Sequence, residues 1–149
     1  MIVAANITRE NIDLGKHITA VRSSRCGALA IFVGQVRDHD PDAESEVVAL
    51  EYSAHPDAET VLAALLDRVV ESVADQSDRT GGTDEIRVAA THRIGNLEVG
   101  DDALVVTVAA AHRAEAFAVC REVVEAIKAE LPIWKRQWEH DGGSSWVGL

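Results

Sequence analysis

The order of apolar segments along the chain constrains its fold more than any other feature. Short segments rich in β-forming residues come in pairs between longer segments with helical periodicity. The expected strands are Ile2–Ile7, Ala28–Val36, Val47–Tyr52, Ile86–His92, Ala103–Ala110, Trp134–Glu139 and Ser145–Val147. Because a doubly wound parallel sheet requires strict alternation of strands and helices, the paired strands predict an α+β fold with a largely antiparallel sheet.

Three segments are expected to be helical. Asn11 or Asp13 can cap a short helix that runs toward Arg22, and the second helix spans about Pro56–Ser77. The third and longest helix is expected over about His112–Leu131. Its predicted buried stripe consists of Phe117, Cys120, Val124, Ile127 and Leu131. A break is expected at Thr80-Gly81-Gly82-Thr83, and no linker divides the chain, so residues 1–149 are expected to form a single domain.

The charge balance excludes two classes of partner. Fourteen basic and twenty-five acidic residues give a formal net charge of −11, whereas nucleic-acid and anionic-membrane binders need a surplus of Lys and Arg. No apolar stretch approaches the roughly 20 residues that span a bilayer, and no basic leader precedes the first strand. We therefore expect a cytoplasmic protein with no nucleic-acid or membrane partner, and two cysteines that remain reduced.

Lysine is scarce, and two of the three lysines lie close together in the chain. Only Lys16, Lys128 and Lys135 are present, against eleven arginines. On the third helix, Arg113 falls near the centre of the predicted buried stripe and Lys128 on its flank. A partly desolvated cation is a stronger anion ligand, although the stem of Lys128 could equally snorkel with its charge in water.

Two further segments carry candidate anion ligands. In the expected strand from Trp134, side chains alternate, so Lys135 and Gln137 share one face, either toward a ligand or as a surface cation–π contact. The second strand passes Gly34 and delivers Arg37 at a sheet edge. The following Asp38-His39-Asp40 is not expected to bind a metal, because adjacent residues of an extended chain point to alternating faces.

The start of the third helix offers another anion site. His112 and Arg113 lie beside unpaired helix N-terminal amides, although His112 could also serve only as a cap. Arg113 and Lys128 are separated by about 22 Å along one helix. One small substrate cannot contact both within a single chain. Either the two residues serve different sites, or a second copy of the protein brings its His112–Arg113 end to the first copy's Lys128 end, and we favour the second arrangement.

These motifs together resemble the MoaE family, the large catalytic subunit of molybdopterin synthase. The resemblance covers nearly the whole chain in the same order. The matching segments are Gly27–Arg37, Leu50–Tyr52, His92–Gly95 with Gly100–Asp101, Ala111–Phe117, Lys128–Arg136 and Trp146–Val147. It implies a MoaE-like α/β hammerhead fold with three helices.

The resemblance also implies a reaction and partners. The family makes molybdopterin from cyclic pyranopterin monophosphate by adding two sulfurs as a dithiolene. A small ubiquitin-like (MoaD-like) subunit supplies the sulfur as a thiocarboxylate on the last glycine of its C-terminal Gly-Gly. Two large subunits form a central homodimer within a heterotetramer. No cofactor or metal is expected.

By position, the resemblance assigns catalytic roles to Lys128 and Lys135, with Lys128 central. The implied substrate-binding residues are Gln35, Val36, Arg37, His112, Arg113, Lys128, Lys135, Arg136 and Gln137. Gln35 departs from the family, in which many members have a lysine, so one substrate cation is missing here. The competing hypothesis is a non-catalytic dimeric domain that binds an anionic metabolite or forms a scaffold for another protein.

Overall fold

The computed structural model describes residues 1–77 and 85–148, and the break expected at Thr80–Thr83 lies outside them. The elements are β1 (Ile2–Thr8), α1 (Leu14–Val21), β2 (Ala28–Gln35), β3 (Val47–Ala54), α2 (Ala58–Ser77), β4 (Ile86–Arg93), β5 (Gly95–Glu98), β6 (Asp102–Ala110), α3 (Arg113–Glu130), β7 (Ile133–Glu139) and β8 (Ser144–Gly148). All the expected helices and strands are present. β5 is an additional strand that the sequence pattern did not reveal.

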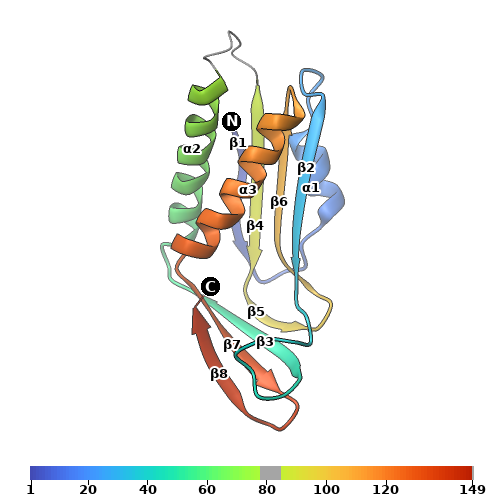
Figure 1. The fold of residues 1–149 in the computed structure, drawn as a ribbon, viewed down its shortest axis with the longest axis vertical. Helices are drawn as coiled ribbons and strands as arrows, with labels where there is room; N and C mark the ends of the chain where they lie inside the picture. The colour runs from blue at the N-terminus through green and yellow to red at the C-terminus, as the bar shows by residue number, and fades with distance from the viewer. Residues whose placement is uncertain (78–84, 149) are drawn as a thin grey trace.

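The strands form two sheets of four. The first has the order β1-β4-β6-β2, in which only the β1–β4 pair is parallel, and the second has the order β5-β3-β7-β8 and is antiparallel throughout. Helices α2 and α3 cover one face of the first sheet and α1 packs on the other, while the second sheet forms the lower end of the molecule (Figure 1). The α+β prediction is confirmed, with the strands divided between two sheets.

The main core lies between the first sheet and the helix pair α2–α3. Alternate residues of β4 and β6, among them Val88 and Val106, point toward the helices. The buried face of α3 consists of Ala116, Val119, Cys120, Val123 and Ile127. The stripe predicted for this helix is therefore wrong at Phe117, whose side chain is 67% exposed. The true face is rotated by roughly 60° from the predicted one, because α3 packs against α2 as well as the sheet.

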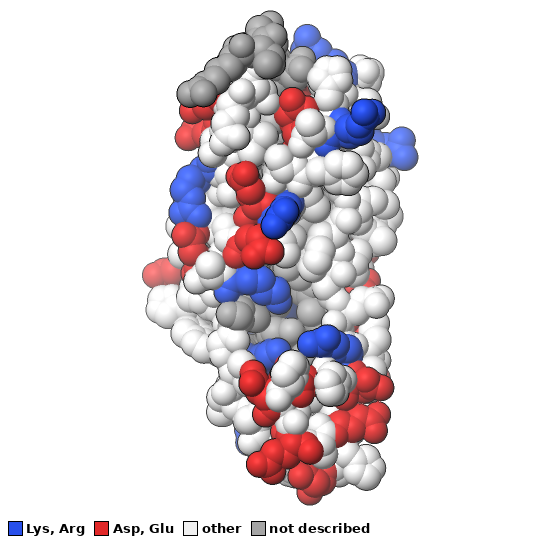
Figure 2. All heavy atoms as spheres, viewed as in Figure 1, with Lys and Arg blue, Asp and Glu red and all other residues white. Residues whose placement is uncertain are grey.

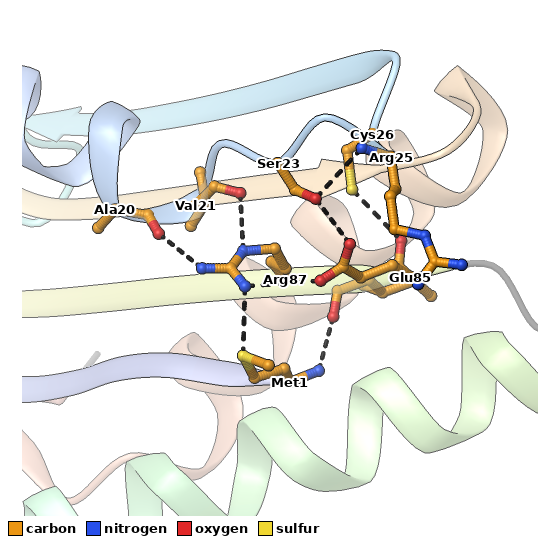
Figure 3. A network of polar contacts seen from close by, with 9 residues as sticks. Met1, Ala20, Val21, Ser23, Arg25, Cys26, Glu85 and Arg87 are labelled. Atoms are coloured by element: carbon orange, nitrogen blue, oxygen red, sulfur yellow. Dashed lines mark hydrogen bonds and ion pairs between the residues drawn. The ribbon is translucent and has the colours of Figure 1, made fainter.

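Side-chain contacts fix the short helix α1 to the second face of the first sheet. Asp13 caps its first turn by accepting from the Lys16 backbone N–H at 3.0 Å, as predicted. At its other end, the Arg87 guanidinium of β4 donates to the carbonyls of Ala20 and Val21 at 3.0 Å each (Figure 3). An isolated helix of eight residues is marginal in water. These contacts, together with packing on the sheet, hold it in place.

The second sheet is assembled from distant parts of the chain. After β4, Gly95 adopts a positive φ of +90° and the chain leaves the first sheet to pair β5 with β3. Strand β7 then pairs with the other side of β3, and a turn at Gly142 joins β7 to β8. The second sheet therefore lies directly beyond the C-terminal end of α3. Within residues 1–77 and 85–148, no helix is long and apolar enough to cross a bilayer.

Candidate active site

Lys128 and Lys135 converge where α3 meets the second sheet. Lys128 occupies the last turn of α3, and the chain turns at Leu131 and Pro132 before entering β7, which carries Lys135. Although Lys128 is exposed as a residue, partial burial lowers the pKa of its amine, and the nearby Lys135 ammonium lowers it further. The predicted pairing of these two lysines in one region is therefore present in a single chain.

Lys135 is held by an ion pair that the sequence analysis missed. Its Nζ donates to Asp40 Oδ2 at 3.1 Å, and the two side chains are only 21% and 13% exposed. A hydrogen bond from the Asp42 backbone N–H lowers the pKa of the Asp40 carboxyl, as do Lys135 and, more weakly, Arg37. The loop between β2 and β3 thus delivers a fixed negative charge beside Lys135 and near Arg37.

The exit of β2 positions Arg37. Gln35 ends the strand and is exposed, and a register shift beside Gly34 marks the irregularity expected there. Val36 is buried, and its backbone N–H donates to Asp101 O at 2.9 Å while its carbonyl accepts from Gly100 N at 2.7 Å. Arg37 therefore directly follows a residue whose backbone is fixed by two hydrogen bonds. Lys and Arg side chains gather at this junction of α3 and the second sheet, with Asp and Glu dominating the end below (Figure 2).

Alternation along β7 separates two predicted site residues. Gln137 lies on the same face as Lys135, is 1% exposed, and its Nε2 has no hydrogen-bond partner among the described residues. Arg136 lies on the opposite face. Its guanidinium donates to Ser144 Oγ at 3.1 and 3.2 Å and stacks over the rings of two tryptophans, Trp138 at 4.1 Å and Trp146 at 5.6 Å. Within one chain, Arg136 and Lys135 thus do not face the same space.

His112 and Arg113 lie at the far end of α3. His112 is the N-cap residue and Arg113 the first residue of the helix, and both are exposed. The fifteen residues from Arg113 to Lys128 correspond to about 22 Å of helix. The structure therefore gathers Arg37, Lys128, Lys135 and Gln137 near the C-terminal end of α3 and leaves His112 and Arg113 at its N-terminal end.

Two buried aromatic residues, His92 and Tyr52, border the lysines. His92 is 1% exposed, and its Nδ1 lies 2.7 Å from the Arg93 carbonyl, which can only accept, so the proton resides on Nδ1. Burial, with a smaller contribution from Lys128, lowers the pKa of His92 to about 4. The Tyr52 ring contacts His92 edge-on at 5.0 Å, and burial, with Asp40, raises the Tyr52 pKa to about 12. Both side chains are therefore neutral at pH 7, and the structural role expected of His92 stays a prediction.

Comparison with known proteins identifies the family. The family model described as "MoaE protein" matches residues 7–130, most of the chain. The chain belongs to the MoaE family. This confirms the resemblance carried by the motifs around Arg37, His92, Arg113 and Lys128.

Curated relatives and solved structures agree with this assignment. The chain is 36% identical to molybdopterin synthase catalytic subunit 1 of Mycobacterium tuberculosis, over 95% of this chain and 88% of the relative. It is 35% identical to the molybdopterin synthase catalytic subunit of Thermoplasma volcanium, over 94% of each chain. The crystal structure of molybdopterin synthase from Staphylococcus aureus superposes with a TM-score of 0.72 at 28% identity, over 96% of both chains. The predicted MoaE-like fold is thus confirmed across nearly the whole chain.

Proposed function

We propose that this MoaE-family chain is the catalytic subunit of a molybdopterin synthase. It transfers sulfur from the thiocarboxylated C-terminal glycine of a small ubiquitin-like subunit to cyclic pyranopterin monophosphate, in two rounds that build the dithiolene. The observation that carries the proposal is the convergence of Lys128, Lys135 and Arg37 beside the buried face of β7. The shared name of the curated relatives supports the same activity.

The geometry suits displacement at a phosphate-bearing carbon. The thiocarboxylate sulfur forms a bond to a substrate carbon, and the bond from that carbon to a phosphate ester oxygen breaks, with its electron pair leaving on the oxygen. Water then hydrolyses the resulting thioester, which returns the C-terminal carboxylate of the small subunit and leaves the sulfur on the substrate. Arg37 can bind the phosphate through charge-assisted hydrogen bonds, because its guanidinium presents several donors in a plane. The two amines neutralise the charge that develops on the leaving oxygen, where a preorganised cation is most effective.

We propose further that two copies of the chain complete each site. Strand β2 is an edge of the first sheet, and beside it Ile31 on β2 and Phe117 on α3 are 45% and 67% exposed. A hollow of about 310 Å³ lies between them and is also lined by Cys120 and Val124. Figure 2 shows a wide uncharged surface on this side of the molecule. Large exposed apolar side chains grouped around one hollow are typical of a contact surface.

A two-fold axis through this surface accounts for the separated cations. In an isologous contact each copy presents the same patch, and a two-fold axis perpendicular to α3 makes the two α3 helices antiparallel. The His112–Arg113 end of one copy then lies near Lys128 of the other. Two such sites, each served by one small subunit, give the expected heterotetramer. The relatives' description as catalytic subunits is consistent with an assembly of more than one kind of chain.

The proposal is tested by combining the chain with cyclic pyranopterin monophosphate and a thiocarboxylated ubiquitin-like subunit, and measuring dithiolene product. Lys128→Ala should lower the rate by about 100-fold or more, the scale of a lost proton-transfer or charge-stabilising group. Lys16→Ala is the matched control, because Lys16 is an exposed lysine on α1. Product formation by Lys128→Ala at the wild-type rate, or none by the wild type, would refute the proposal.

A further inference from the structure

The two lysines of the site have unequal surroundings. Lys135 donates to Asp40 at 3.1 Å, and both side chains of this pair are largely buried. Lys128, by contrast, forms no ion pair with any of the residues that the structure describes. Without a nearby carboxylate, each ammonium group would be disfavoured by the charge of the other. The Asp40 carboxylate stabilises the positive charge of Lys135, and so makes the surroundings of the two amines different.

The loop between β2 and β3 fixes the Asp40 carboxylate. Its Oδ1 accepts from the Asp42 backbone N–H at 2.8 Å, which leaves Oδ2 directed at Lys135. The Asp40 carbonyl accepts from Ala43 N at 3.1 Å, and Val47 N donates to Asp38 O at 2.9 Å where the loop enters β3. The carboxylate is therefore held by the local backbone as well as by the lysine.

We propose that Asp40 is a positioning residue that gives the two lysines different tasks. Its carboxylate holds Lys135 as a fixed cation for the substrate phosphate, and it leaves Lys128 as the amine that releases and accepts a proton. The catalytic roles given to the two lysines depend on the proposed function above. The difference between the surroundings of the two amines depends only on the ion pair and on their positions.

The other titratable groups around the pair leave this assignment unchanged. His92, from β4, and Tyr52, from β3, are both neutral at pH 7, with pKa values near 4 and 12. Arg37 adds a permanent positive charge on the open side of the loop. Partial burial and the neighbouring Lys135 lower the pKa of Lys128. Lys128 is therefore the amine whose surroundings favour loss of a proton.

The scarcity of lysine makes a direct test practicable. The chain has only three lysines, so ¹³C-labelled lysine gives three side-chain Cε signals, assigned by replacing each lysine with arginine in turn. In the wild-type protein, we expect the Lys128 signal to titrate below the ordinary range of lysine, because partial burial and the Lys135 ammonium lower its pKa. In Asp40→Asn, the Lys135 signal should change its chemical shift, because its Nζ loses the carboxylate that lies 3.1 Å away. The Lys16 signal should not move.

Two variants serve as controls for this titration. Asp42→Asn removes the same charge two residues away, from an exposed side chain, and keeps the backbone N–H that Asp40 accepts. It should leave all three signals in place, and Asp40→Glu should keep the Lys135 signal near its wild-type position. The inference is overturned if the Lys128 signal of the wild type titrates in the ordinary range of lysine, a result that needs no variant to fold. It is also overturned if Asp40→Asn leaves the Lys135 signal unmoved.

Kinetics provide the second readout. In Asp40→Asn, the basic limb of the pH profile of kcat should move to lower pH by about one unit, and Asp40→Glu should restore it. If Asp40→Asn instead lowers KM and leaves the kcat profile in place, Asp40 competes with the phosphate and the positioning role is refuted. If the wild-type protein forms no dithiolene product, the proposed function fails, whereas the titration still decides the role of Asp40.

Discussion

A site shared between two copies can be tested by mixing two inactive variants. Lys128→Ala removes a cation at the C-terminal end of α3, and Arg113→Ala removes one at its N-terminal end, about 22 Å away on the same helix. Each variant alone should form a dimer with two damaged sites. In a mixed dimer, one site carries both substitutions. The other site combines the intact Lys128 of one copy with the intact Arg113 of the other.

The expected recovery follows from the symmetry of the dimer. Random reassortment of equal amounts makes about half of the dimers mixed, and half of the sites in these are intact, so the mixture should regain about one quarter of the wild-type rate. The assay is dithiolene formation after the two variants are unfolded and refolded together, compared with each variant refolded alone. Recovery of no more than the sum of the two separate rates would show that each site lies within one chain.

Two further outcomes are expected. Phe117→Asp places a charge on a side chain that is already 67% exposed, so the melting temperature of the protomer should stay nearly unchanged. In sedimentation analysis the same variant should be a monomer where the wild type is a dimer. Val99→Asp is the control, because Val99 is an apolar residue in another region with 44% exposure, and this variant should remain a dimer. His92 has a folded-state pKa of about 4 against an ordinary value of 6.5, so the unfolded chain binds more protons between these pH values and stability falls as the pH is lowered. In urea unfolding, His92 should lower the free energy of unfolding by about 2–3 kcal/mol between pH 7 and pH 4.5. The His92→Gln variant should lose correspondingly less over the same pH range. An equal loss in both proteins would contradict the pKa assignment.

Local patterns in the sequence were sufficient to predict most of the secondary structure. Alternation placed Lys135 and Gln137 on one face of a strand, and Asp13 was identified as a cap, because both depend on neighbouring residues. Strand β5 was missed because its four residues carry no periodicity of their own and are ordered by pairing with β3. Phe117 was assigned to the core because apolar spacing on a helix does not reveal what covers it. A contact between subunits produces the same pattern as a contact with the core.

The acidic residue of the site was harder to predict than its lysines. The lysines were noticeable because lysine is rare in this chain and because the family motif carries them. Asp40 was considered only as a metal ligand, since the sequence places it beside His39 and Asp38. Its actual partner, Lys135, lies 95 residues further along the chain. Only the pairing of β3 with β7, which returns the chain to the β2–β3 loop, brings the two together.

The two faces of β7 make the site depend on the turn that precedes this strand. A slip of one residue in the pairing of β7 with β3 would direct Lys135 to the opposite face and put Arg136 in its place, while the strand stayed paired. The turn at Leu131 and Pro132 sets this phase, because the Leu131 N–H donates to the Ile127 carbonyl of α3 and the His55 N–H, just after β3, donates to the Pro132 carbonyl. An insertion or deletion of one residue in that turn would therefore exchange the two faces of the strand. A turn that supplies no reacting group is consequently subject to the same constraint on its length as the reacting residues are on their identity.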